Sequence, residues 1–376
     1  MKYVAYYDTP ANKAERRGYQ LSAANKIDYI CKTLNRLGHD VQIVSASMTE
    51  NREGCKGKII PLFENTSLKL FPCMGMRNLP VRILRRILCR CRLLCELIFH
   101  TKKGENVLVY HSLAYAGTIA LARKIKDFRL ILEVEEVYAD VSGNEQDGKW
   151  EHRLFALADA FLFPTQTLNQ KINTRCKPSA IIHGTYQVEP ERGFSLFQDG
   201  KIHCVYAGTF DPRKGGAAAA AAAAEFLPED YHIHILGFGS DEEEQNMRQL
   251  TDVLSAKSRC GITYDGLLSG EEYIRFLQSC DIGLSTQNPD AAFNATSFPS
   301  KILSYMANGL RVVSIRIPVI VESAVGDRVF YYDRQTPEEI AKAIRCVDRS
   351  GENDPRRLIE SLDQDFEQKL EELLKH

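Results

Sequence analysis

Short apolar runs alternate with stretches of helical periodicity along most of the chain. In the first half, strands are expected at residues 3–7, 41–45, 106–110, 130–137, 160–163 and 180–182, with a helix over residues 23–37. A second series of strands is expected at residues 203–207, 232–236, 261–263, 282–285, 312–315 and 329–332. Strands that alternate with helices predict parallel, doubly wound sheets, an α/β fold. Ligands of such sheets bind at the carboxyl ends of the strands.

A polar segment at residues 187–200, with two glycines and a proline, separates the two series. It predicts a linker between domains of similar size, which agrees with the chain length of 376 residues. We therefore expect an N-terminal domain over residues 1–190 and a second domain over residues 191–354. A final helix over residues 355–376 would pack back on the first domain.

Charge is distributed unevenly, although the net charge is only −1. Residues 1–190 hold 28 Lys and Arg against 19 Asp and Glu, and acids predominate in the rest. A basic first half suggests a phosphate-bearing or membrane-surface partner there, with uneven surface charge as the alternative. We find no membrane-spanning run and no signal peptide, and the eleven cysteines lack metal-site spacing. Reduced thiols in a cytoplasmic protein are expected.

Residues 298–314 carry the clearest chemical signal. Pro299 suits the first turn of a helix, where its missing N–H costs nothing, and it places Ser300 and Lys301 at the helix N-terminus. Free N–H groups and the positive end of the helix dipole predict a phosphate site there. Gly309 can end the helix in the left-handed conformation. The alternative is an ordinary helix of an α/β protein.

A glycine-rich turn follows the first strand of the second half. From Gly208 to Gly216 the sequence reads Gly-Thr-Phe-Asp-Pro-Arg-Lys-Gly-Gly, which brings Arg213 and Lys214 to a helix start. Two cations beside glycines suit a nucleotide diphosphate, and the spacing is not that of a Walker loop. The alternative is a basic surface turn. Two later strand ends have turns of the same placement, at Gly237, Gly239 and Tyr264.

Together these motifs resemble the donor-binding elements of retaining glycosyltransferases with the GT-B fold, particularly glycosyltransferase family four (glycosyl transferases group 1). The resemblance implies two Rossmann-like domains that face a cleft, with the last helix crossing back to the first domain. It also implies a nucleotide-diphosphate-sugar donor on the second domain, with cations in place of a metal ion, so no metal or other cofactor is expected. The implied donor-binding residues are Gly208, Arg213, Lys214, Gly237, Gly239, Tyr264, Thr296, Pro299, Ser300, Lys301 and Ser304.

At two of these positions the chain departs from the family. Family four usually has two glutamates eight residues apart, the first just before the Pro-Ser-Lys helix and the second within it. Thr296 and Ser304 stand at those positions here. A hydroxyl can hydrogen-bond a sugar but supplies no charge, so we expect a divergent member with weaker or differently arranged donor binding. Loss of catalysis is the alternative.

In the first half, one strand ends with Glu133, Glu135 and Glu136 at the edge expected to face the cleft. Alternation directs Glu133 and Glu135 to one face and Glu136 to the other. Many family members have a histidine near this position that touches the reacting sugar. Glu133 and Glu135 are therefore candidate catalytic groups, as a general base or by stabilising positive charge. His111, which ends the preceding strand, is a third candidate. Pairing of the acids with arginines, and a structural histidine, are the alternatives.

Residues 81–99 have the pattern of a basic amphipathic helix, with five arginines and a single acid. Such helices lie on anionic membranes, so peripheral attachment to the inner face of the membrane is one hypothesis. A core helix with solvated arginines is the other. The apolar stripe comprises Leu84, Leu88, Cys91, Cys95 and Ile98.

Two weaker signals come from position alone. Gly18 and Tyr19 precede the first helix, where the fold has an acceptor-side loop. His232 and His234 alternate on one strand, but with no third ligand in view we interpret them as structural.

The predicted function is that of a retaining hexosyltransferase of bacterial polysaccharide biosynthesis. A sugar would move from the nucleotide sugar to a hydroxyl of a glycan or lipid-linked glycan, and no nucleic acid is expected as a partner. A nucleotide-sugar epimerase with the same fold is one alternative, and a non-catalytic sugar-nucleotide-binding protein is the other.

Overall fold

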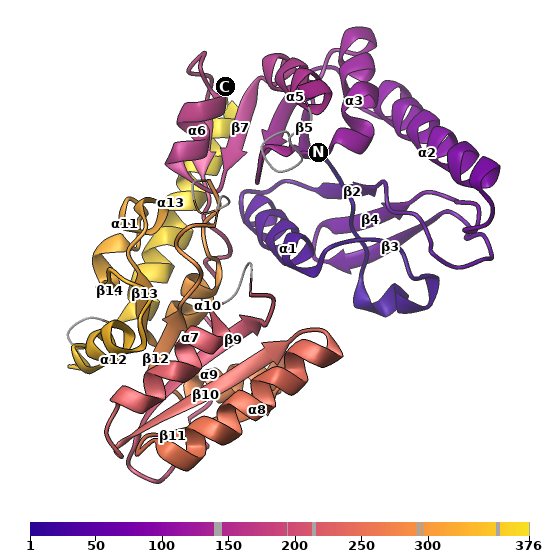
Figure 1. The fold of residues 1–376 in the computed structure, drawn as a ribbon. Helices are drawn as coiled ribbons and strands as arrows, with labels where there is room; N and C mark the ends of the chain where they lie inside the picture. Colours follow the sequence, from indigo (N-terminus) through magenta and orange to yellow (C-terminus); the bar gives the residue numbers. More distant parts are fainter. Residues whose placement is uncertain are drawn as a thin grey trace. The chain divides into compact units, whose positions relative to one another are not determined.

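The computed structural model describes residues 1–138, 145–193, 195–212, 216–291, 294, 296–350 and 354–375. The chain forms two compact units (Figure 1): Met1–Ile182 with Asp365–His376, and His183–Gln364. Each unit contains a mainly or fully parallel sheet with helices on both faces, as the alternation of strands and helices predicts. The last helix, α13 (Pro355–Lys375), has its second half in the first unit, as expected.

The first unit is built on an eight-stranded sheet with the order β3-β4-β2-β1-β5-β6-β7-β8. All neighbouring strands are parallel except β3 and β4, which pair in the antiparallel sense. The strands are β1 (Lys2–Ala5), β2 (Val41–Ser45), β3 (Lys58–Phe63), β4 (Thr66–Leu70), β5 (Asn106–Tyr110), β6 (Arg129–Glu133), β7 (Ala160–Phe163) and β8 (Ser179–Ile181).

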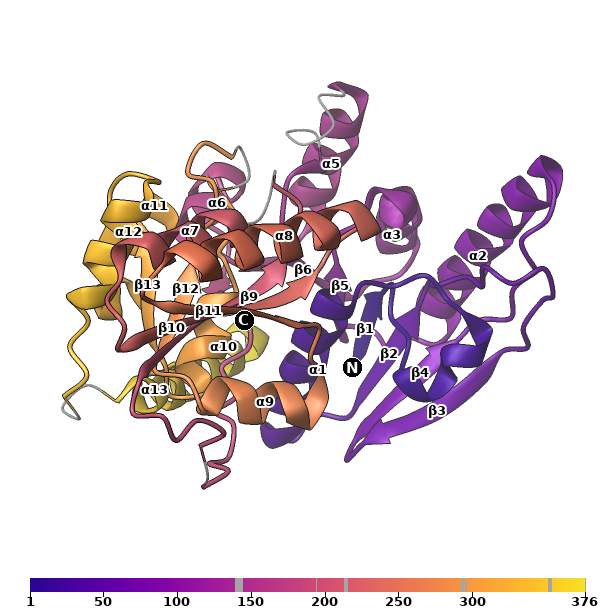
Figure 2. The same ribbon diagram turned by 60° about the horizontal axis from the view of Figure 1, so that its bottom comes forward.

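Helices cover both faces of this sheet. On one face α2, α3 and α5 lie side by side (Figures 1 and 2), over a core that includes Val4, Val109 and Leu132. On the other face α1 meets α13, where Tyr29 stacks on Phe366 with ring centroids 5.8 Å apart. The helices of this unit are α1 (Leu21–Arg36), α2 (Leu79–Phe99), α3 (Leu113–Ile125), α5 (Glu145–Leu157) and α6 (Gln166–Ile172).

The second unit is built on a six-stranded, fully parallel sheet with the order β11-β10-β9-β12-β13-β14. Figure 2 shows α7, α8 and α12 on one face of this sheet and α9 and α10 on the other. The strands are β9 (Ile202–Thr209), β10 (Tyr231–Phe238), β11 (Gly261–Gly266), β12 (Ile282–Ser285), β13 (Arg311–Ile315) and β14 (Val329–Tyr332). The helices are α7 (Ala217–Ala222), α8 (Asp241–Lys257), α9 (Gly270–Gln278), α10 (Lys301–Ala307), α11 (Pro318–Val321) and α12 (Pro337–Arg345).

One part of the first sheet, the β3–β4 hairpin, has no counterpart among the expected strands. Pro61 lies inside β3, and proline in a strand is tolerated at a sheet edge because it cannot donate a ladder hydrogen bond. β3 is indeed the edge strand, and all of its residues are exposed or half-buried. Its apolar run, residues 59–63, is therefore interrupted by Pro61 and is nowhere fully buried.

Candidate functional site

Packing of α10 brings a lysine to the carboxyl end of β9. Tyr305, in the middle of α10, is fully buried, and its hydroxyl accepts a hydrogen bond from the Ala207 N–H at 2.8 Å. Gly283 in β12 makes room for this ring, because a Cβ there would lie 2.3 Å from ring carbons of Tyr305. These contacts hold α10 against β9 and β12, so that its first residue, Lys301, reaches the end of β9.

Lys301 is a cation with no acidic partner among the described residues. Its Nζ lies 4.0 Å from the centre of the Tyr206 ring and 2.9 Å from the place of a Cβ on Gly208. Desolvation lowers the pKa of Lys301 to about 8. A desolvated cation without a counter-ion gains strongly from an incoming anion, so Lys301 is a candidate phosphate ligand with a physical argument among the described residues.

The start of α10 differs in detail from the expected one. Ser300 is the N-cap and Pro299 precedes it, although the Ile302 N–H still bonds the Pro299 carbonyl at 3.1 Å. The helix has only seven residues, so its dipole is small and the argument for phosphate binding depends mainly on the Lys301 charge. Gly309 does follow the helix with a left-handed φ of 91°, as expected.

Glycines occupy the next-to-last positions of β9 and β10, Gly208 and Gly237. Gly237 pairs with Gly208 across the two strands and has a φ of 148°, and a Cβ on it would lie 1.8 Å from the Gly208 carbonyl oxygen. A Cβ on Gly239 would lie 2.8 Å from the Glu243 side chain. At these glycines the place of a side chain is taken by atoms of the protein itself, so only glycine fits there; contact of this backbone with a diphosphate stays a prediction.

The turn after β9 lies partly outside the described residues, which do not include Arg213 and Lys214. Both ends of this turn contact one side chain. The Tyr206 hydroxyl donates to the Thr209 carbonyl at 2.9 Å and accepts from the Gly216 N–H at 3.3 Å. Tyr206, which the sequence analysis did not single out, therefore connects this turn with Lys301.

The remaining donor candidates lie at the end of β11 and around α10. Arg248 stacks on the Tyr264 ring at 4.2 Å, so this ring already has a cationic neighbour on one face. Thr296 is half-buried. Ser304 is also half-buried, and its side chain hydrogen-bonds the Tyr273 hydroxyl of α9. Ser304 can therefore offer a hydroxyl where the family has a carboxylate, in a network that α9 holds in place.

In the first unit, the acids at the end of β6 surround a lysine from α1. Lys26 Nζ lies 2.5 Å from Glu135 Oε1 and 3.9 Å from Glu133 Oε1. Glu133 is fully buried, and the Tyr3 hydroxyl donates to its other oxygen. Burial raises the pKa of Glu133 well above its ordinary value, and the Lys26 ammonium opposes this shift. The cation beside these acids is thus a lysine, whereas the sequence suggested local arginines.

His111 lies in the core of the first unit. It is 2% exposed, its ring packs 5.1 Å from both Tyr138 and Phe155, and its Nε2 lies 3.5 Å from a Glu151 carboxylate oxygen. Burial lowers the pKa of His111 to about 4, so the imidazole is neutral at pH 7. Such burial favours the structural interpretation of this histidine over contact with a substrate.

A cavity of about 370 Å³ opens at the carboxyl ends of β1 and β2. It is lined by apolar groups that include Tyr6 and Leu93 and by two arginines of α2, Arg86 and Arg90. Arg90 also donates to the Ala114 carbonyl at 2.8 Å. The sequence analysis missed this cavity, because Arg86 and Arg90 belonged only to the pattern of a basic helix. Its lining suits a ligand with an apolar part and an anionic group.

The two acceptor-side residues expected from position lie elsewhere in the same unit. Gly18 is exposed, and its N–H bonds the Met48 carbonyl at 3.2 Å. A Cβ on Gly18 would meet no atom within 4 Å, so space is open around it. Tyr19 is half-buried. Met48 also lines the cavity, which places Gly18 near it.

The buried face of α2 is not the apolar stripe that the sequence suggests. Leu84 is 45% exposed, and Cys91 and Cys95 are exposed. The face turned to the sheet instead carries buried Arg85 and Glu96. Its members are Arg85, Cys89, Leu93, Glu96 and Leu97. The apolar stripe is therefore largely left on the outside of this unit, beside exposed arginines.

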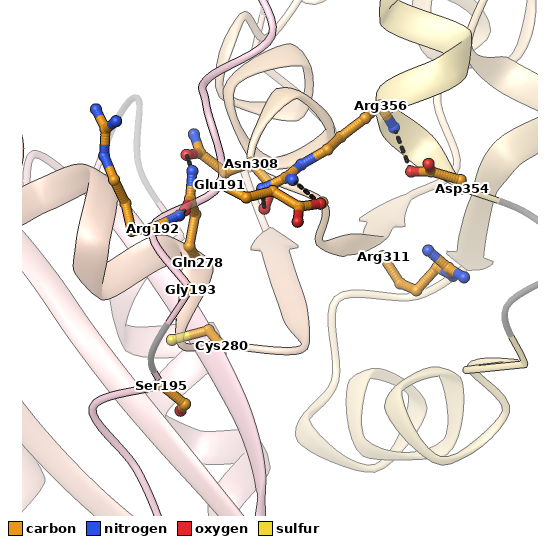
Figure 3. Close-up of a pocket in the computed structure, with 11 residues that line it drawn as sticks. Glu191, Arg192, Gly193, Ser195, Gln278, Cys280, Asn308, Arg311, Asp354 and Arg356 are labelled. Carbon is orange, nitrogen blue, oxygen red and sulfur yellow. Dashed lines mark hydrogen bonds and ion pairs between the residues drawn. The ribbon is translucent and has the colours of Figure 1, made fainter.

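The second unit has another cavity, of about 480 Å³, at the amino ends of β12 and β13 (Figure 3). Its arginines already have partners: Arg356 pairs with Glu191 at 2.5 Å, and Arg192 pairs with Glu271 at 2.8 Å. Arg311 donates to backbone carbonyls of residues 348 and 350. The cavity lies at the edge opposite the glycine turns, so we do not assign the donor to it.

Comparisons with known proteins agree with the fold and with the motifs of the second unit. Residues 201–348 match the family model described as "Glycosyl transferases group 1". No curated protein sequence matches the chain significantly. The region matched by the family model includes every expected donor-binding residue.

Solved structures resemble the chain over its whole length. The α,α-trehalose-phosphate synthase (UDP-forming) from Burkholderia xenovorans, in complex with glucose-6-phosphate, has a TM-score of 0.68 at 9% identity, covering 100% of this chain and 99% of that one. The E. coli trehalose-6-phosphate protein bound with UDP-2-fluoro glucose has a TM-score of 0.64 at 10% identity, covering 98% of both chains. Sucrose-phosphate synthase from Thermosynechococcus elongatus has a TM-score of 0.60 at 13% identity, covering 99% and 94%.

The solved structures show the fold of the chain, which is the GT-B arrangement of two Rossmann-like units. Its second unit carries a glycosyl transferases group 1 domain over residues 201–348. The resemblance seen in the sequence and the expected fold are both confirmed.

Proposed function

We propose that this protein is a retaining glycosyltransferase that moves a sugar from a nucleotide-diphosphate-sugar donor to a hydroxyl of a glycan or lipid-linked glycan acceptor. The observation that carries the proposal is Lys301, a desolvated cation without a carboxylate partner among the described residues, beside Gly208 near the carboxyl end of β9. A diphosphate supplies the missing negative charge, and the glycines let it reach the backbone.

Positioning and charge stabilisation account for the proposed chemistry without a metal ion. As the diphosphate leaves, negative charge grows on its oxygens, and Lys301 with Arg213 and Lys214 would stabilise that charge. The first unit would bind the acceptor. In that unit the cavity lined by Tyr6, Leu93 and the two α2 arginines offers both an apolar wall and cations for a lipid-linked phosphate.

Two alternative functions of this protein can be distinguished from glycosyl transfer by experiment. An epimerase with the same fold would convert the donor sugar without any acceptor. A sugar-nucleotide-binding protein without activity is suggested by Thr296 and Ser304, which stand at the positions of the family's glutamates. A thermal-shift screen with nucleotide sugars identifies the donor, because a ligand that binds the native state raises its stability. Product analysis with and without acceptor then separates the three functions, and conversion of the donor alone would contradict transfer.

Arg213→Ala and Lys214→Ala should each weaken binding of the nucleoside diphosphate with little change in melting temperature. Charge-assisted hydrogen bonds to phosphate contribute about 1.5–3 kcal/mol each. Isothermal titration calorimetry measures the effect, with Lys201→Ala as a control of equal charge change outside the turn. Unchanged affinity in both variants would remove this turn from the diphosphate site.

We further propose that α2 attaches the protein to an anionic membrane surface. Among the described residues, no helix combines the length and apolar character needed to cross a bilayer. However, α2 exposes large apolar side chains next to arginines. The exposed apolar residues of its first half are Leu79 (65%), Ile83 (51%), Leu84 (45%) and Ile87 (49%). Apolar groups beside cations are typical of helices that lie in the membrane interface.

Replacing Arg82 and Arg86 together by glutamine should weaken binding to anionic vesicles roughly 30-fold. Each basic residue near such a surface contributes about 1 kcal/mol, and both side chains are exposed, so folding should be preserved. Lys102→Gln with Lys103→Gln makes the same charge change just beyond the helix and serves as the control. Vesicle co-sedimentation at low salt decides the question, and a wild-type protein that stays in the supernatant would contradict membrane attachment.

A further inference from the structure

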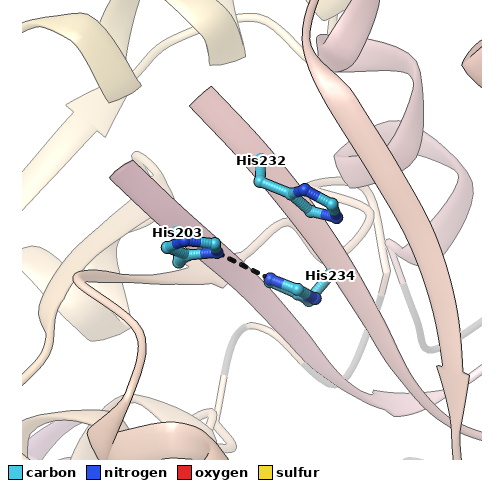
Figure 4. Close-up of side chains that lie close together, drawn as sticks. All are labelled: His203, His232 and His234. Carbon is cyan, nitrogen blue, oxygen red and sulfur yellow. Dashed lines mark hydrogen bonds between the residues drawn. The ribbon is translucent and has the colours of Figure 1, made fainter. Parts of the chain in front are cut away.

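Three histidine rings lie close together on one face of the second sheet (Figure 4). His203 belongs to β9, and His232 and His234 belong to β10, where His232 is paired directly with His203. One ligand nitrogen from each ring lies within 4.8 Å of the other two. His203 and His234 are buried, and His232 is half-buried. The third histidine that the sequence did not reveal is His203, which the register of two parallel strands brings beside the other two.

Carboxylates hold the outer nitrogens of two of these rings. His203 Nε2 lies 3.0 Å from Asp199 Oδ1, and His234 Nδ1 lies 3.1 Å from Asp265 Oδ2. The inner nitrogens, His203 Nδ1 and His234 Nε2, face each other at 2.9 Å. A histidine that donates its outer N–H to a carboxylate and turns its other nitrogen inward is the usual arrangement of a metal-binding imidazole.

Asp199, His203, His234 and Asp265 form a row of four side chains, and the hydrogen bonds between them cannot all form while both imidazole rings are neutral. Three contacts run from Asp199 through His203 and His234 to Asp265, and each needs one hydrogen. Two neutral imidazoles bring two hydrogens, and the carboxylates bring none. If both rings donate outward to their carboxylates, the two inner nitrogens present only lone pairs to each other. Either one additional proton or a metal ion between them resolves this conflict, and the metal titration below distinguishes the two.

We propose that His203, His232 and His234 bind a divalent transition-metal ion such as Zn²⁺. Imidazole nitrogens suit such ions, with metal–nitrogen bonds of about 2.0–2.1 Å and ligand nitrogens roughly 3.3 Å apart in a tetrahedral site. The 2.9 Å contact already has that scale. The His232 ring stacks on His234 with planes 16° apart, and its Nε2 contacts the Thr263 hydroxyl at 3.2 Å, so this ring has to turn out of the stack to direct a nitrogen at the ion. The fourth position is left to water.

This ion would stabilise the fold of the second unit and would take no part in the transfer reaction. The histidines stand near the amino ends of β9 and β10, whereas the glycine turns lie at the carboxyl ends. Asp199 and Phe197 precede β9, and the Phe197 ring stacks on His203 and His234 with centroids 4.0 and 4.6 Å away. Metal binding would therefore connect this preceding segment, β9, β10 and, through Asp265, β11.

Metal titration of the full-length, chelator-treated protein tests the proposal. We expect Zn²⁺ to bind in a 1:1 ratio and to raise the melting temperature, and Co²⁺ to give the visible bands of a four-coordinate nitrogen and oxygen site. His232→Gln should abolish both effects. Asp199→Asn, a smaller change at a partly exposed carboxylate, should weaken affinity about 10- to 100-fold. His152→Gln alters an exposed histidine of α5 and should change nothing.

Eleven free cysteines offer competing ligands, and the readouts distinguish them. A Co²⁺ spectrum dominated by thiolate charge-transfer bands would assign binding to cysteine and overturn the proposal. So would unchanged Zn²⁺ affinity in both His232→Gln and Asp199→Asn, or a wild-type protein that Zn²⁺ does not stabilise. Should His232→Gln fold poorly without metal, Asp199→Asn alone decides between these results.

Discussion

Lys301→Met should weaken binding of a nucleoside diphosphate about 10- to 150-fold without lowering the melting temperature. The first effect follows because a charge-assisted bond to phosphate contributes about 1.5–3 kcal/mol. The second follows because Lys301 is desolvated and pairs with no carboxylate among the described residues, so the cost of burying its charge opposes what its contact with the Tyr206 ring contributes to folding. Methionine keeps the length and apolar character of the stem that packs on Tyr206.

A matched control separates this effect from a general loss of positive charge. Lys257→Met removes an exposed cation at the C-terminus of α8. This lysine pairs with Glu225 at 2.5 Å and belongs to none of the turns that follow β9, β10 or β11. Calorimetry should show unchanged nucleotide affinity in this variant. If Lys301→Met binds like the wild type, or loses affinity only because it unfolds, the donor site does not include Lys301.

Measurement over pH gives an independent test of the same residue. Because desolvation lowers the pKa of Lys301 to about 8, nucleotide affinity of the wild type should fall as the pH rises through about 8, and Lys301→Met should lack this step. Stability should change in the opposite direction. Between pH 8 and 10.5 the unfolded lysine holds its proton and the folded one does not, so stability rises with pH in the wild type relative to the variant.

The sequence predicts the central strands well because they are buried on both faces. Continuous apolar runs such as β5, β7 and β12 were placed with the bounds that the structure has. The β3–β4 hairpin escaped prediction because Pro61 interrupts the apolar run of β3, and β4 alternates buried and half-buried residues over only five positions. The pattern of apolar residues along the chain thus reports how deeply a strand is buried, and it does not identify strands that are only partly buried.

The core face of α2 shows a second limit of sequence reasoning. Arg85 and Glu96 are buried there because tertiary partners satisfy them. Arg85 donates to the Thr49 carbonyl at 2.6 Å, and Glu96 accepts from Lys2 and Lys69 at 2.7 and 2.6 Å. These partners lie 27 to 94 residues away in the chain, so no helical periodicity can reveal them.

Candidate site residues could be predicted from the sequence where a local motif fixes the backbone. They could not be predicted where packing brings together two elements that are distant in the sequence. Gly208 and Lys301 were found from their turn and helix start, and the structure places Lys301 Nζ beside Gly208. Tyr206, which joins them, is an ordinary strand residue in the sequence. Lys26 was missed for the same reason, because only the fold brings α1 beside the end of β6.

The acids beside Lys26 lead to the last prediction: Glu135→Gln should cut turnover about 10²- to 10⁴-fold while donor affinity stays nearly intact. Glu135 is the outer of the two paired acids, with 27% of its side chain exposed at the carboxyl edge of β6, whereas Glu133 is fully buried. Positive charge develops at the anomeric carbon as the sugar transfers, so loss of a carboxylate there appears in the transition state.

Glu133→Gln and Glu136→Gln complete this test, because a purely structural ion pair predicts a different pattern. If Glu135 only pairs with Lys26, its amide variant should melt at a lower temperature and turn over normally once folded. Glu133→Gln should fold, since an amide oxygen can still accept the Tyr3 hydroxyl hydrogen bond, and Glu136→Gln makes the same change one residue along. Melting temperature, donor affinity and turnover are therefore measured together in all three variants.

Normal turnover in Glu135→Gln and Glu133→Gln would exclude the acids from catalysis. The buried His111 would then be the remaining candidate in this unit, and its neutral ring would have to become accessible before it could touch a sugar.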